Sequence, residues 1–130
     1  MRAALLLALL AAPAAAQQID CAAPKATPEI TYCEGLALEA ADADLNAAYA
    51  DAVAGARAFD TGDFPAGPLP AEEQLRDAQR AWIAFRDAAC SAEAALHYGG
   101  TGANLVFLSC QRRLTEARTA DLRIYAEAAP

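Results

Sequence analysis

Apolar residues recur along the chain at alternating steps of three and four, the spacing that places side chains on one face of an α-helix. The first such stripe consists of Leu38, Ala41, Leu45, Ala48 and Ala52. Thr27 suits the capping position before it, and Pro28 suits the first helical position because its missing N–H would have no partner there. The pattern therefore predicts a helix over about residues 28–55, ending near Gly55.

Two further stripes follow the same alternation. The second consists of Leu75, Ala78, Trp82, Phe85 and Ala89. The third consists of Phe107, Cys110, Leu114 and Ala117, flanked by Leu108, Leu122, Ile124 and Tyr125. They predict helices over about residues 71–96 and 103–126, joined by a glycine-rich turn at residues 98–102.

No run of alternating β-branched residues bounded by turns interrupts these stripes. We therefore predict an all-α protein, a small three-helix bundle, because three apolar faces can bury one another in that arrangement. We expect its core to contain Leu45, Tyr49, Leu75, Trp82, Phe85, Leu114 and Leu122.

The first connection differs in composition from the helices. Residues 55–70 contain three glycines and three prolines, which cannot continue a helix, so we expect a long surface loop. Just beyond it, Glu72 with Arg76 and Asp77 with Arg80 have spacings that allow ion pairs on the outer face of the second helix.

The N-terminal 16 residues have the pattern of a secretory signal peptide. Arg2 precedes an apolar run, and three alanines follow Pro13, so we expect cleavage before Gln17. A membrane span would need about 20 apolar residues, more than this segment provides before the polar Gln17 and Gln18. The residues before Cys21 lack the small-residue box of a lipoprotein, so we do not expect a lipid anchor at Cys21. The prediction is an extended lead-in over residues 17–26, a domain over residues 27–126, and a periplasmic or secreted location.

The charge of the chain is acidic. It has 10 basic and 17 acidic residues and a formal net charge of -7, and loss of Arg2 with the signal would leave -8. This balance disfavours nucleic acid and anionic membranes and favours a cationic protein partner. An acidic net charge is also explained by solubility with no charged partner at all, so charge by itself does not select a function.

Four cysteines, Cys21, Cys33, Cys90 and Cys110, predict two disulfides in an exported protein. Antiparallel helices would gather them at one end, where three pairings are open. The two that cross between distant elements, Cys21–Cys90 with Cys33–Cys110 or Cys21–Cys110 with Cys33–Cys90, are favoured because they close long loops. The cysteines lack the close CxxC pairs of zinc and redox sites, so we expect no metal and no cofactor.

Several polar residues lie on the flanks of the apolar stripes. Asp44 follows Cys33 by three helical turns, and it would need a partner if buried. We predict a structural polar network formed by Asp44, Asn46, Gln79, Arg86 and Arg118. A ligand pocket built from the same carboxylate and arginines is the alternative.

Residues suited to catalysis are sparse. His97 is the only histidine, and no serine or cysteine nucleophile stands in a recognisable motif with it. Asp42 and Asp44 are two apart on a helix, so their side chains point in different directions. We therefore expect that the protein is not an enzyme.

Several short motifs and single residues lie along the mature chain in a pattern typical of one family. They are Cys21 and Cys33 twelve residues apart, residues 44–46 (DLN), 78–82 (AQRAW), 86–90 (RDAAC), 99–101 (GGT), Cys110, Leu114, Arg118 and Leu122. This set resembles the LprI-like lysozyme-inhibitor domain family of exported bacterial proteins. The resemblance implies a small helical, disulfide-containing domain and, for the namesake, lysozyme inhibition. The chain departs from the common pattern of the family in its Pro- and Gly-rich loop, and we expect it to lack the namesake's lipid anchor.

Two functional hypotheses follow. The first is a lysozyme inhibitor that binds a cationic lysozyme through the tight turn of Tyr98, Gly99, Gly100 and Thr101. The second is a non-enzymatic interaction module of the cell envelope that binds its partner on the loop over residues 55–70.

Overall fold

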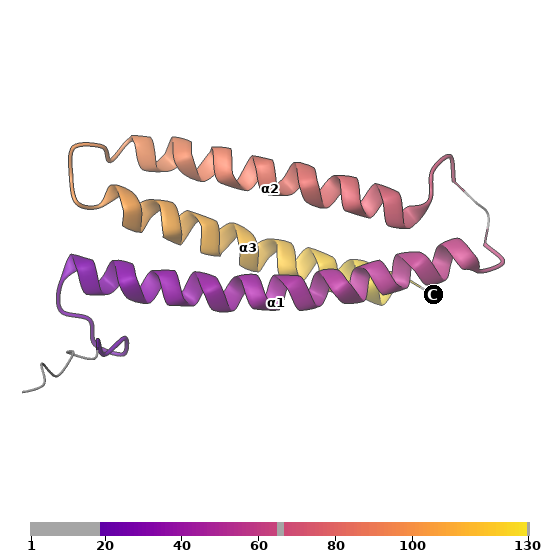
Figure 1. The fold of residues 1–130 in the computed structure, drawn as a ribbon, viewed down its shortest axis with the longest axis horizontal. Helices are drawn as coiled ribbons and strands as arrows, with labels where there is room; N and C mark the ends of the chain where they lie inside the picture. Colours follow the sequence, from indigo (N-terminus) through magenta and orange to yellow (C-terminus); the bar gives the residue numbers. More distant parts are fainter. Residues whose placement is uncertain (1–18, 65–66, 130) are drawn as a thin grey trace, which may run out of the picture.

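Three helices account for most of the chain, as the sequence predicts. The computed structural model describes residues 19–64 and 67–129, so the predicted signal peptide lies outside the described residues. The helices are α1 (Thr27–Thr61), α2 (Ala71–Ala95) and α3 (Ala103–Ala128), with no strand in the described ranges. Figure 1 shows α1 and α3 running in the same direction and α2 antiparallel to both. The all-α, three-helix prediction is confirmed.

Helix α1 extends one and a half turns beyond the predicted end at Gly55. Glycine in a helix keeps its backbone hydrogen bonds and costs only about 1 kcal/mol relative to alanine. Here it also permits a close approach, because a Cβ on Gly55 would stand 2.6 Å from the Cβ of Ala129 beyond α3. The expected loop from residue 55 is therefore wrong, and the connection begins at Gly62, whose N–H bonds the Phe59 carbonyl at 3.2 Å.

The first apolar stripe faces the other two helices, and all five of its members are buried. The main cluster of the core combines residues of all three helices: Leu45, Ala48, Ala52, Ala56, Leu75 and Leu122. Tyr49 and Trp82 pack against this cluster and are partly buried. Alanine dominates the α1 side, so the helices approach closely with little side-chain entropy lost.

The inward face of α2 is rotated by about one residue from the predicted stripe. Phe85, expected in the core, is 60% exposed, and Ala78 is also exposed. Gln79 and Cys90 are buried instead. Successive helix positions are about 100° apart, so a shift of one residue replaces an apolar face by a partly polar one.

Helix α3 also buries polar residues that the pattern did not select. Thr115 and Thr119 are buried, whereas Leu114 is only half-buried. The hydroxyl of Thr119 donates to the Thr115 carbonyl one turn earlier at 2.9 Å. Ile124, counted in the apolar side of this helix, is 66% exposed.

Each disulfide joins two cysteines that are consecutive among the four in the sequence. Cys21 bonds Cys33 and Cys90 bonds Cys110, with Cα–Cα distances of 5.5 and 5.4 Å. Both favoured cross-linked pairings are therefore wrong. Loop length measures how much a bond restrains the unfolded chain, but native proximity selects the partner. The short turn between α2 and α3 sets Cys90 opposite Cys110, and the lead-in folds back onto α1.

None of the described helices combines the length and apolar character that a membrane crossing requires.

Candidate functional site

Arg86 of α2 joins the three helices at mid-bundle. One terminal nitrogen donates to an Asp42 carboxylate oxygen of α1 and to the Thr115 hydroxyl of α3, both at 3.1 Å. Its Nε donates to Asp87 at 3.1 Å. The Arg86 side chain is only 14% exposed, so these bonds compensate a charge held largely away from water.

A second polar contact and an aromatic ring extend this group along α2. Arg118 of α3 donates through Nε to the side-chain oxygen of Gln79 at 3.0 Å, and Gln79 is 7% exposed. The guanidinium carbon of Arg86 lies 5.3 Å from the centre of the Trp82 ring, which is a cation–π distance. The inward polar residues of α2 are thus paired across the bundle.

The five residues of the predicted network are only partly brought together: Gln79, Arg86 and Arg118 form hydrogen bonds between helices. Asp44 and Asn46 are exposed on α1, and Asp42 is the acid that meets Arg86. Two positions along a helix turn the side chain by about 200°, so only one of Asp42 and Asp44 can face α2. No buried side-chain nitrogen or oxygen in the described chain lacks a hydrogen-bond partner. Arg86 bonds both α1 and α3, so this group ties α2 to the other two helices.

One end of the bundle, which we call the disulfide pole, is formed by residues 19–33 and 90–110. The start of α1, the end of α2 and the start of α3 meet there (Figure 1). Cys90 and Cys110 are 0% and 2% exposed. Arg112 of α3 also bonds Glu34 of α1 at 2.6 Å, and this hydrogen bond raises the pKa of the Arg112 guanidinium. All three helices are therefore fixed near this pole.

The turn between α2 and α3 lies at the disulfide pole and is exposed. Tyr98 is 75% exposed, and the three residues after it are exposed as well. Gly99 has φ of +95°, a backbone angle that favours glycine, so the sharp turn depends on this position. The four predicted contact residues thus lie together on one exposed tip.

Two grooves lie beside this turn and were not predicted. The larger, of about 710 Å³, is lined by Ala26, Thr27, Pro28, Thr31, Thr101 and Asn104. The smaller, of about 330 Å³, is lined by Ser91, Ala94, Tyr98, Ala103, Asn104 and Phe107. They share Asn104, and no ionisable acid or base lines either one. The first groove brings together residues about 70 positions apart, which local sequence patterns do not report.

The opposite end, which we call the loop pole, is formed by residues 56–64, 67–76 and 122–129. Asp60, in the last turn of α1, accepts the backbone N–H of Ala71 at 2.7 Å and of Glu72 at 2.9 Å. It therefore caps the start of α2 from another helix. Sequence reasoning missed this cap because the acceptor stands 11 residues before the donor.

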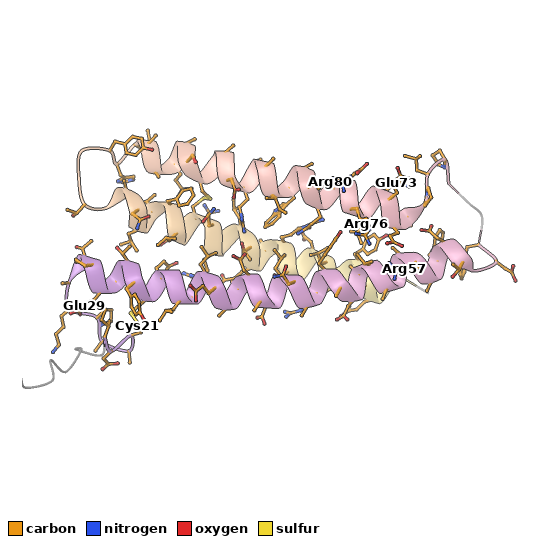
Figure 2. All side chains as sticks on the ribbon, in the orientation of Figure 1. Cys21, Glu29, Arg57, Glu73, Arg76 and Arg80 are labelled. Carbon is orange, nitrogen blue, oxygen red and sulfur yellow. A yellow bond between two sulfur atoms is a disulfide. The ribbon has the colours of Figure 1, made fainter. Side chains whose placement is uncertain are left out.

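Ion pairs cover the same end. The Glu72 carboxylate accepts from Arg57 at 2.8 Å and from Arg76 at 2.6 Å. Hydrogen bonding to Arg57, and then to Arg76, lowers the pKa of Glu72 to about 2. Figure 2 shows Arg57, Arg76 and Arg80 toward this end. The predicted Glu72–Arg76 and Asp77–Arg80 pairs are confirmed.

An apolar pocket of about 410 Å³ lies beside these charges. Its lining residues are Ala56, Phe59, Phe64, Ala71, Tyr125, Ala128 and Ala129. The rings of Phe59 and Phe64 stack with centres 5.1 Å apart. The loop pole thus presents an apolar recess, whereas the grooves of the disulfide pole combine apolar residues with uncharged polar ones.

Comparison with known proteins identifies the family. The family described as "Lysozyme inhibitor LprI" matches residues 20–122, which is most of the chain. The chain belongs to the LprI lysozyme-inhibitor family. It is also 38% identical over 128 residues to an uncharacterized protein of Rhizobium meliloti (strain 1021), a match that covers 95% of this chain and 92% of that one. No solved structure matches.

The family motifs correspond to the structural features above. The AQRAW and RDAAC segments supply Gln79, Trp82, Arg86 and Cys90, which hold α2 to its neighbours. Within the part of the chain that the structure describes, no group of three histidine, cysteine or acidic side chains is placed to hold a metal ion. The disulfides and the family together indicate an extracytoplasmic protein.

Proposed function

We propose that this LprI family member binds a lysozyme and blocks the cleft in which that enzyme hydrolyses glycan. The observation that favours this function is the exposed tip at Tyr98, Gly99, Gly100 and Thr101, about two helical turns beyond the buried Cys90–Cys110 bond. A segment that is already rigid loses little conformational freedom on binding, so more of its contact energy remains as affinity.

The chemistry of the tip suits an enzyme cleft that contains two carboxylates. No acidic residue stands among residues 96–102, so the tip brings no repelling charge to those carboxylates. The Tyr98 side chain provides an apolar ring and a hydroxyl that both donates and accepts hydrogen bonds. The net charge of -7 attracts a basic enzyme over longer distances.

Inhibition is tested by titrating lysozyme with the mature protein and following hydrolysis of cell walls. We expect Tyr98→Ala to raise the apparent inhibition constant at least about tenfold, because exposed aromatic anchors dominate protein interfaces. Phe64→Ala at the loop pole is the matched control and leaves inhibition unchanged. Unaltered lysozyme activity at a large molar excess of the unmodified protein would refute the proposal.

A second candidate function is supported by the apolar pocket of the loop pole. An envelope protein that inserts an apolar side chain between Phe59 and Tyr125 would fit its lining. In this case Phe64→Ala abolishes capture of the envelope partner, Tyr98→Ala does not, and neither variant changes lysozyme activity. The same two variants therefore separate the two functions.

A further inference from the structure

The two grooves beside the Tyr98 turn have a lining that the proposed function leaves unexplained. They share Asn104 in the first turn of α3; the larger lies between the starts of α1 and α3, and the smaller between the end of α2 and the start of α3. We propose that they form a binding site for a neutral oligosaccharide, which the protein binds in the absence of any lysozyme.

The hydrogen-bonding groups of the larger groove match sugar hydroxyls. Thr27 and Thr31, one helical turn apart on α1, share this groove with Thr101 and Asn104, beside the apolar Ala26 and Pro28. The Thr31 hydroxyl donates to the Thr27 carbonyl at 2.9 Å, so it is left as an acceptor for a ligand. Thr101 and Asn104 are exposed and the α1 threonines half-buried. Hydroxyl and amide side chains both donate and accept hydrogen bonds, as sugar hydroxyls do, whereas carboxylates only accept and ammonium groups only donate.

The smaller groove adds aromatic surface. Tyr98 and Phe107 line it together with Ser91. An aromatic ring provides a flat apolar face against which the C–H face of a sugar ring can pack, and the Tyr98 hydroxyl remains available for a hydrogen bond. The two grooves thus offer polar groups on one side of Asn104 and rings on the other.

Charge selects a neutral ligand over a charged one. Neither groove contains an acidic or basic side chain, although 21% of the chain is charged. An anionic ligand would find no cation in the lining and would be repelled by the net charge of -7. A cationic ligand would find no carboxylate there to replace its lost hydration.

The walls of this site are fixed before a ligand arrives. The Cys21–Cys33 bond ties the lead-in to α1, and the Cys90–Cys110 bond ties α2 to α3. Glu34 and Arg112 join α1 to α3 about one turn further along. A site formed in advance loses little entropy on binding, which weakly binding saccharides require.

The test is a titration of the ¹⁵N-labelled mature protein with the neutral tetramer of N-acetylglucosamine, followed by NMR without lysozyme. We expect saturable shifts at Thr27, Thr31, Thr101 and Asn104. Asn104→Leu should weaken binding about tenfold, since it removes the amide shared by both grooves. Asn46→Leu, an exposed substitution at mid-α1, is the matched control and leaves binding unchanged.

Three outcomes would overturn the proposal. One is an absence of shifts up to the solubility limit of the tetramer. Another is equally tight binding of a sulfated tetramer, which would contradict a neutral site. The third comes from a separate titration with lysozyme: perturbation of these signals by lysozyme but not by the tetramer would make the grooves a protein contact. Because the titration with the tetramer contains no lysozyme, a failure of inhibition leaves its result unaffected.

Discussion

The two ends of the bundle are held together by different kinds of bond. At the disulfide pole, the covalent Cys90–Cys110 bond lies fully inside the protein beside the turn. At the loop pole, the Asp60 carboxylate caps α2, and Glu72 pairs with Arg57. At the disulfide pole the link between α2 and α3 therefore depends on the oxidation of sulfur, while α1 is joined to α3 by the Glu34–Arg112 ion pair. The loop pole depends on the ionisation of carboxylates.

Because the bonds differ, the two ends should respond differently to pH and salt. A disulfide holds its geometry over a wide range of pH and salt, whereas exposed ion pairs are screened by salt and lose their charge in acid. The exposed turn is at the end where a disulfide joins α2 to α3, so we expect it to stay formed in a variable extracytoplasmic medium. The loop pole is the end that responds to the medium.

The largest expected effect comes from removing the buried bond. Cys90→Ala with Cys110→Ala should lower the free energy of unfolding by about 3 kcal/mol, the value for releasing a loop of this length, and a cavity in the core would add to the loss. Urea unfolding followed by circular dichroism measures it. A loss below about 1 kcal/mol would show that side-chain packing, and not the bond, holds this pole.

The other disulfide provides the matched control for that experiment. Cys21 is exposed, as are most residues of the lead-in. Without the bond to Cys33 the lead-in can detach while the helices remain packed, so Cys21→Ala with Cys33→Ala should cost about 1 kcal/mol at most. Equal losses for the two double variants would contradict the greater importance assigned to the buried bond.

The next effect is expected at the loop pole. Asp60→Ala removes both acceptors from the start of α2 and should lower the free energy of unfolding by about 1 to 2 kcal/mol. Asp60→Asn keeps one acceptor and should cost less. Asp63→Ala, which removes an exposed carboxylate just beyond α1, is the control in thermal unfolding. If Asp60→Ala and Asp63→Ala melt alike, the cap does not stabilise this end.

Helix number and the α1 face could be predicted from the sequence because leucine and alanine there alternate with polar residues. On α2 the same rule selected Phe85, since hydrophobic spacing ignores polar residues that find partners on other helices. Gln79 is buried because Arg118 bonds it, and Arg118 lies 39 residues away. The spacing of apolar residues predicts which apolar side chains are buried. It does not predict polar side chains that are buried because they form hydrogen bonds with other helices.

The candidate site also has one part that the sequence predicts and another that it does not. The turn at Gly99 could be predicted because a tight turn requires particular backbone angles that glycine adopts easily, so a local run of glycines indicates it. Its grooves could not, since Thr27 and Thr101 meet only when α1 packs beside α3. The disulfide pairing failed for a related reason: the sequence ranks the pairings by loop length, but the short turn between the antiparallel α2 and α3 determines which sulfurs meet.

The smallest effect is a pH dependence confined to the loop pole. The Arg57 guanidinium, and then that of Arg76, lowers the pKa of Glu72 from 4.5 to about 2. A pKa lower in the folded than in the unfolded protein means that ionised Glu72 favours folding. This contribution is complete above about pH 4.5 and is lost as the pH falls through about 2. Both arginines are about half exposed, so water screens the pairs and the gain in stability is small.

Carboxyl ¹³C NMR of the folded protein at pH 3 measures this shift directly, because an ordinary glutamate is mostly protonated there and Glu72 should remain mostly ionised. Arg57→Gln should move the pKa of Glu72 back toward 4.5. Arg80→Gln, which removes the partner of Asp77, should leave it unchanged. A Glu72 that titrates like an ordinary glutamate in the unmodified protein would remove the acid-dependent half of the contrast between the poles, while the disulfide pole would keep its structure throughout the titration.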